Sequence, residues 1–166
     1  ANKKVCIIDL DLRKPKVNRI FDVVNENGIN DYLSGKIGFD DMIRHDESGI
    51  DYIMSGEKIE AVINVLEADK LKDLIAKLRD TYDYVFIDTP PVLAVSDPLY
   101  IAKFVDGFIY IVSYGEARKK LVNEGVQTIL RTKAPILGSI FTQVDFKQNN
   151  YGYGYTYSYN NSKDDE

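Results

Sequence analysis

The chain has 166 residues, enough for one domain with a hydrophobic core, and its composition of 45% hydrophobic and 28% charged residues is ordinary for a soluble globular protein. No apolar run approaches the roughly 20 residues of a membrane helix, and the first residues do not resemble a secretory signal, so we expect a cytosolic chain. A net charge of −5 without a basic stripe argues against nucleic acid as the main partner.

In chain order, short apolar segments predict the strands of a parallel sheet. Most of these segments are continuous rather than alternating in hydrophobicity, which is typical of strands buried on both faces. The single cysteine, Cys6, lies in the first segment, where we expect a buried core residue rather than a disulfide. The predicted strands are residues 4–9, 50–54, 84–88, 107–112 and 136–141, of which 50–54 is the weakest.

Helical patterns lie between these strands. Apolar residues at helical spacing predict an amphipathic helix from about residue 64 to residue 80. These residues are Leu71, Leu74, Ile75 and Leu78. Asp97 followed by Pro98 predicts an N-cap with proline at the first helical position, and another helix is expected over residues 117–132. The alternation predicts an α/β fold with an open, mostly parallel sheet and helices on both faces.

Charged side chains follow two of the predicted strands at the point where each strand ends. Asp9, Asp11 and Arg13 follow the first strand, and Asp88 ends the strand at 84–88. Ligands of open parallel sheets bind beyond the carboxyl ends of the strands, where these groups converge if the two strands are near neighbours. Carboxylates suit Mg²⁺ and proton transfer, and a guanidinium can steady phosphate oxygens, so the pattern favours a magnesium nucleotide site. The alternative is that the acidic residues only cap loops.

The segment YGYGYTYSYNN, residues 151–161, places tyrosines at alternate positions. They are Tyr151, Tyr153, Tyr155, Tyr157 and Tyr159. Because the residues between them bury almost nothing and a charged terminus follows, we expect a flexible tail at 147–166 that presents its tyrosines, beside a domain at 1–146. An edge strand with tyrosines on one face, or a sticky low-complexity end, are the structural alternatives.

Two motifs carry a resemblance to a known family. IIDLDLRKP resembles the Walker A′ motif, and YVFIDTPP the Walker B motif, of the bacterial tyrosine kinases that govern capsular and exopolysaccharide synthesis. The stretch DTPPVLAVSDPLYIAKFVDGFIYIV and the terminal tyrosine cluster follow the pattern of the same family. The resemblance covers Lys4 to Tyr159 and implies a P-loop NTPase-like fold of the deviant Walker type.

The resemblance implies transfer of the ATP γ-phosphate to the five tail tyrosines, with Mg²⁺ as cofactor. Asp88 matches the Walker B aspartate, which holds Mg²⁺. Asp9 and Asp11 match the A′ aspartates, of which one helps to hold the metal and the other receives the tyrosine proton; we lean towards Asp9 as the base. Arg13 and Lys14 match the basic pair of the family, and both phosphate contact and a structural ion pair remain open for them.

The resemblance also implies partners and a location. One subunit offers its tail to the active site of its neighbour in a ring, and phosphorylation breaks the ring. Each phosphate adds about −1.5 to −2 charge, so repulsion between modified tails would separate the subunits. A membrane activator, the polysaccharide co-polymerase, and a tyrosine phosphatase are the expected partners, and the activator would hold a cytoplasmic kinase at the inner face of the membrane.

The sequence departs from the family because it contains no P-loop of the form GxxxxGK[ST]. The pair Gly35-Lys36 is followed by Ile37, and we interpret it as a helix C-cap. In the family the P-loop precedes the A′ strand. We therefore expect either a truncated chain, without a first strand, the P-loop and its helix, or a natural degenerate relative, and we favour truncation. The chain alone is expected to be inactive.

Two other functions remain open at this point. A partitioning-type ATPase would hydrolyse ATP and leave its tail unmodified. A non-catalytic partner would offer its tyrosine tail as a substrate to a competent kinase.

Overall fold

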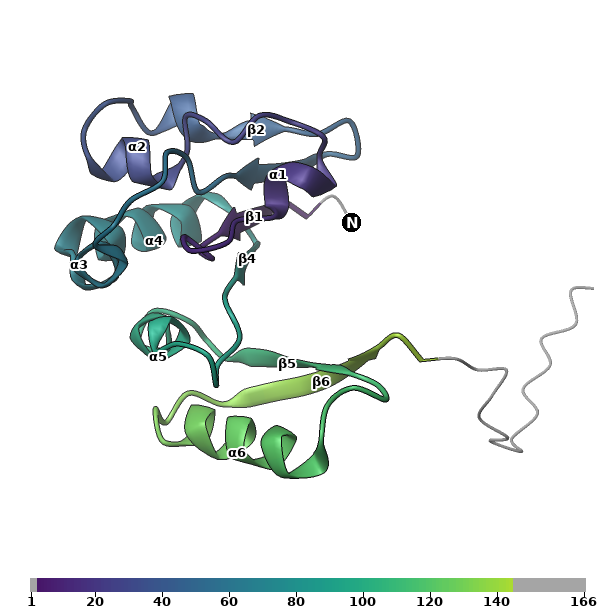
Figure 1. Ribbon diagram of the computed structural model, residues 1–166. Helices are drawn as coiled ribbons and strands as arrows, with labels where there is room; N and C mark the ends of the chain where they lie inside the picture. Colours follow the sequence, from purple (N-terminus) through teal and green to yellow (C-terminus); the bar gives the residue numbers. More distant parts are fainter. Residues whose placement is uncertain (1–2, 145–166) are drawn as a thin grey trace, which may run out of the picture.

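The computed structural model describes residues 3–144, and its strands lie in two sheets (Figure 1). The first sheet has the strand order β2-β3-β1-β4, and the second pairs β5 with β6. All pairs are parallel except β2 with β3, so the α/β fold with a mostly parallel sheet is confirmed. The strands are β1 (Val5–Asp9), β2 (Arg44–His45), β3 (Ile50–Ile53), β4 (Tyr84–Asp88), β5 (Phe108–Ser113) and β6 (Ile136–Thr142).

The helices follow the predicted pattern with one interruption. The helix expected at 64–80 is two helices, because Ala68 has an extended backbone (φ −66°, ψ 135°) and Asp69 starts a new first turn. None of the described helices is long and apolar enough to cross a membrane. The helices are α1 (Val17–Ile20), α2 (Ile29–Leu33), the 3₁₀ helix η1 (Asp40–Met42), α3 (Val62–Glu67), α4 (Asp69–Thr81), α5 (Asp97–Ile101) and α6 (Lys119–Leu130).

The core lies between the four-stranded sheet and the helices α3, α4 and α5. The four apolar residues that predicted α4 are all buried, and they join Cys6 and Ile8 of β1 in one hydrophobic cluster. Full burial of such a side chain contributes about 1.5–3 kcal/mol relative to its exposed state. The packing therefore fixes β1 and β4, whose carboxyl ends carry the candidate site.

The opposite face of β4 is open among the described residues. Tyr84 and Phe86 are 54% and 48% exposed, while Val85 and Ile87 pack against the core. The expectation that this strand is buried on both faces is therefore wrong for residues 3–144, because nothing in that range covers the second face. In the same part of the chain β4 pairs only with β1 and β5 only with β6, so each leaves one edge unpaired. Figure 1 shows the two sheets as separate parts joined through the segment after β4.

Candidate functional site

The carboxyl ends of β1 and β4 bring the acidic residues together. Asp9 and Asp88 are direct partners in the parallel register, and the Leu10 N–H donates to the Asp88 carbonyl oxygen at 2.9 Å. The last residues of the two strands therefore face the same edge of the sheet, as the sequence pattern predicts. Asp11 follows in the loop between β1 and α1.

Asp9 organises this loop from within. Its side chain accepts three backbone hydrogen bonds, from Asp11 N–H on Oδ1 at 3.1 Å and from Lys16 and Val17 N–H on Oδ2 at 2.9 Å each. The residue is only 1% exposed. Burial raises the pKa of Asp9 above its usual range, and the three backbone donors oppose that rise. Both oxygens of Asp9 are thus engaged in shaping the loop.

Asp11 is the more accessible of the two A′ aspartates. It is half-buried, and within residues 3–144 its side chain accepts one hydrogen bond, from Lys14 N–H on Oδ1 at 3.0 Å. Its Oδ2 therefore has no donor in that part of the chain. A carboxylate oxygen without a donor is free to accept a proton or to meet a cation.

Asp88 lies beside both of these carboxylates. More than a third of the residue is exposed, yet its partial burial raises its pKa, and the nearby charges of Asp9 and Asp11 raise it further. Such crowding of like charge favours a bound cation. In the range that the structure describes, no three ligand side chains surround a point as a ready metal site. The residues fit Mg²⁺, because this ion commonly keeps several waters and takes only one or two carboxylates.

Arg13 is held in an ion pair. Its Nε donates to Asp97 Oδ2 at 2.7 Å and its Nη2 donates to Asp97 Oδ1 at 2.9 Å, while Asp97 is completely buried. The pair raises the pKa of the Arg13 guanidinium. Of the two roles left open for Arg13, this geometry supports the structural ion pair. The N-cap predicted for Asp97 is wrong, because Ser96 occupies the cap position and the Asp97 side chain turns to Arg13 instead.

Comparisons with known proteins bear on this arrangement. No family model matches the chain. A putative tyrosine-protein kinase in the cps region of Klebsiella pneumoniae is 36% identical over 154 residues, which are 92% of this chain. The solved kinase domain of VpsO superposes with a TM-score of 0.82 at 32% identity, over 86% of this chain and 71% of that domain. The chain belongs to the bacterial tyrosine kinases.

The likeness of this chain to its relatives concerns one part of their length. The solved kinase domain of the Escherichia coli tyrosine kinase Etk superposes with a TM-score of 0.79 at 31% identity, over 92% of this chain and 61% of that domain. The chain spans about a fifth of the length of the first curated relatives that it matches. The family predicted from the Walker A′ and Walker B motifs is thus confirmed.

Two other predictions from the sequence, the helix C-cap at Gly35-Lys36 and the tyrosine tail, have different outcomes. Gly35 follows the end of α2 in the left-handed conformation (φ 81°), and the Lys36 ammonium pairs with the Glu57 carboxylate, so the interpretation of Gly35-Lys36 as a helix C-cap is confirmed. The tail at 147–166, with Tyr151, Tyr153, Tyr155, Tyr157 and Tyr159, lies outside the described residues.

Asp97 is the residue that sequence reasoning missed at this site. An Asp-Pro pair at a helix start is a common capping pattern, so it predicts an exposed N-cap and not a buried carboxylate. Arg13 and Asp97 lie in different loops, and their pairing can be recognised only once β1 and β4 are known to be neighbours. No local signal in the sequence marks this pair.

Proposed function

We propose that the complete protein is a protein-tyrosine autokinase that transfers the ATP γ-phosphate to tyrosines of its own or a neighbouring subunit's tail. The observation that carries the proposal is the register of Asp9 with Asp88, which sets the A′ and B aspartates at one edge of the sheet. Asp11 extends this edge with a carboxylate oxygen open to an incoming group. Membership of the bacterial tyrosine kinases supports the reaction class.

In this proposal the acidic residues have separate roles. Asp88 would hold Mg²⁺, which when bound neutralises charge on the phosphates. Asp9 keeps the loop in shape, because its oxygens already accept three backbone hydrogen bonds. We therefore assign the role of general base to Asp11, whereas the sequence alone favoured Asp9.

In this proposal the phosphate is transferred by direct displacement at the γ-phosphorus. The phenol of tyrosine has a pKa near 10 and is protonated at neutral pH, so its proton passes to a carboxylate oxygen of Asp11 as the phenolic oxygen bonds to the γ-phosphorus. The bond from that phosphorus to the β,γ-bridging oxygen breaks, and ADP leaves. Arg13 donates two of its five N–H groups to Asp97, which supports a structural role for the guanidinium.

The wider role rests on the relatives. One relative is named for the cps region of its genome, which supports a role for this protein in capsular or exopolysaccharide synthesis. We propose that the complete kinase works as a ring with a membrane activator, the polysaccharide co-polymerase, and that a tyrosine phosphatase resets the tail. The glycine and serine residues between the tail tyrosines suit repeated entry into a neighbouring site.

The experiment is phosphopeptide mapping of the full-length protein after incubation with Mg-ATP, beside the variants Asp9→Asn, Asp11→Asn and Asp88→Asn. We expect phosphate on the tail of the wild type, none in Asp88→Asn, and a loss of about 10²- to 10⁴-fold in kcat for Asp11→Asn at an unchanged melting temperature. Asp9→Asn should lower the melting temperature as well as the rate, because it disturbs the loop.

Other outcomes point to the competing functions. ATP hydrolysis with an unmodified tail would identify a partitioning-type ATPase. Phosphate that appears only when a competent relative is added would identify a passive substrate. Full activity in Asp11→Asn with none in a folded Asp9→Asn would return the base to Asp9.

A further inference from the structure

The pair of Arg13 and Asp97 joins the two loops that carry the candidate catalytic carboxylates. Arg13 lies in the loop after β1, two residues beyond Asp11, and Asp97 begins α5 at the end of the loop that follows Asp88. Among residues 3–144, the last hydrogen bond between the two strand ends runs from the Leu10 N–H, one residue beyond the register pair of Asp9 and Asp88, to the Asp88 carbonyl oxygen. Asp11 follows that last bond, so its position relative to Asp88 depends on the folding of its own loop, where its N–H donates to Asp9, and on contacts with the loop after β4.

The Asp97 end of the pair is anchored. Asp97 and Pro98 are buried, and Ile101 on the same short helix is part of the hydrophobic cluster that contains α3 and α4. A carboxylate with no exposed surface is costly unless it is paired and hydrogen-bonded. Among residues 3–144, Arg13 is the side chain that pairs with it.

The Arg13 end of the pair is exposed and fixed by geometry. The Arg13 side chain keeps 40% of its surface exposed, so little packing holds it in place. The planar guanidinium instead meets the carboxylate with two parallel bonds of 2.7 and 2.9 Å, an arrangement that fixes orientation as well as distance. The A′ loop, which also contains the buried Leu10 and Leu12, is thus tied to a buried helix start by this bidentate contact.

We propose that Asp97 is a positioning residue for phosphotransfer: it fixes Arg13, and through Arg13 it sets Asp11 against Asp88. The inference rests on the proposed kinase function and adds a role for a residue that touches neither phosphate nor tyrosine. Loss of the pair should slow the chemical step and leave ATP binding nearly unchanged.

The test uses steady-state kinetics of tail phosphorylation by the full-length protein. We expect Asp97→Asn and Arg13→Gln each to lower kcat by about tenfold to a hundredfold, the size of effect that a displacement of about 1 Å produces, with the KM for ATP within about twofold of wild type. The double variant should be no slower than the slower single variant, because both substitutions break the same contact. Arg13→Lys keeps a positive charge beside Asp97 but lacks the two parallel N–H groups of the guanidinium. It should therefore retain the melting temperature and still have a lower kcat.

The matched control is the ion pair of Lys3 with Asp83, at the amino ends of the same two strands. Asp83→Asn removes a charge of the same kind far from the site and should leave kcat unchanged. Full kcat in a folded Asp97→Asn or in Arg13→Lys would overturn the positioning role, as would a fall in kcat that merely follows the melting temperature across all variants. If Asp97→Asn does not fold, the kcat of Arg13→Lys alone tests the positioning role. A wild type without tail phosphorylation would instead refute the kinase function.

Discussion

Asp88 shows how a functional carboxylate can lower the stability of a fold. Its pKa is raised, first by partial burial and then by the charges of Asp9 and Asp11. A group whose pKa is higher in the folded than in the unfolded state stabilises the fold below the unfolded pKa, and this contribution is lost as pH rises through the folded pKa. At neutral pH the ionised Asp88 therefore lowers the free energy of unfolding.

We predict that Asp88→Asn raises the melting temperature at about pH 7, and that this gain shrinks as pH falls towards about 4, the ordinary range of a carboxyl pKa. Scanning calorimetry over that pH range measures the gain. Asp83→Asn is a control in which the change in stability should have the opposite sign, because the hydrogen bond from Lys3 lowers the pKa of Asp83. That variant should lose stability at neutral pH and less at acidic pH. A gain for Asp88→Asn that does not depend on pH would contradict the electrostatic explanation.

At this scale the sequence revealed the acidic residues but not their contacts. Asp9, Asp11 and Asp88 were predictable because each stands at or just after the end of an apolar strand. The three donors to Asp9 and the partner of Arg13 depend on how the loop after β1 folds back, which involves residues up to Val17 and Asp97. The donors to Asp9 lie between 2 and 8 residues away and Asp97 lies 84 residues from Arg13, and contacts of neither kind follow a periodic pattern in the sequence.

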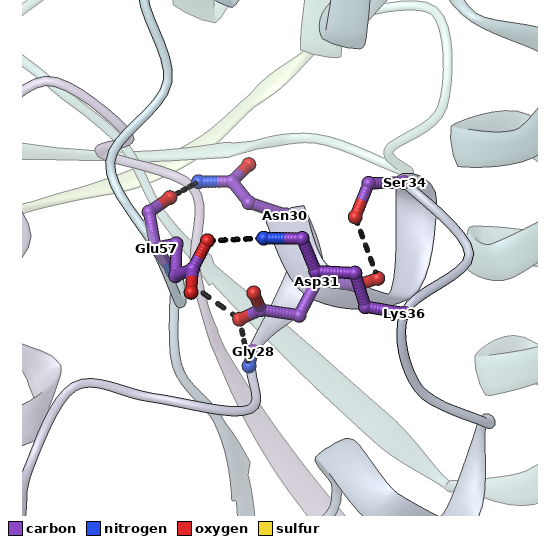
Figure 2. A network of polar contacts seen from close by, with 6 residues as sticks. All are labelled: Gly28, Asn30, Asp31, Ser34, Lys36 and Glu57. Carbon is purple, nitrogen blue, oxygen red and sulfur yellow. Dashed lines mark hydrogen bonds and ion pairs between the residues drawn. The ribbon is translucent and has the colours of Figure 1, made fainter.

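A polar network ties α2 to the segment after β3 (Figure 2). The buried Asp31 side chain accepts N–H hydrogen bonds from Gly28 at 2.9 Å and Glu57 at 3.2 Å, and Asn30 Nδ2 donates to the Glu57 carbonyl oxygen at 2.8 Å. Gly28 allows this approach, because an added Cβ would lie 2.3 Å from the Gly56 nitrogen. The network fixes how the chain leaves β3, a direct neighbour of β1 in the sheet.

We predict that Asp31→Ala lowers the free energy of unfolding by about 1.5–3 kcal/mol, the usual value of hydrogen bonds to a charged group whose partners are then left unsatisfied. Asp41→Ala is the matched control. Asp41 accepts a hydrogen bond from Gly38 N–H at 2.9 Å with the same spacing of three residues, but it is exposed. Its loss should cost under about 1 kcal/mol because water replaces the bond. Urea unfolding compares the two variants, and equal losses would rule out burial as the cause.

Elements with a long repeating pattern were predictable, and short ones were not. The apolar stripe predicted α4, and five apolar segments predicted five strands to within a residue at each end. The break at Ala68 was missed because the stripe continues through α3 with Val62 and Leu66 buried. The two residues of β2 and the single turns of α1 and α2 are too short to show a period.

At the scale of the whole molecule, residues 3–144 follow the predicted α/β plan, but their strands form two sheets rather than one. Local patterns indicate that a segment is a strand, whereas the pairing of edges depends on which strands lie side by side. The apolar character of β4 and β5 suggested burial, and yet Phe86 and Ile111 are 48% and 64% exposed. Among residues 3–144, both strands therefore present apolar side chains beside an unpaired edge.

We expect this combination in residues 3–144 to favour association, because an unpaired edge offers free N–H and carbonyl groups to another strand. We predict concentration-dependent association within about the micromolar to millimolar range. Charge on an edge strand opposes such pairing, so Phe86→Lys and Ile111→Lys should shift the mass towards the monomer. Analytical ultracentrifugation measures the shift. Ile20→Lys is the control, since Ile20 is 76% exposed but lies on α1. A chain that stays monomeric, or one that Ile20→Lys disperses equally, would show that the strand edges are not the cause.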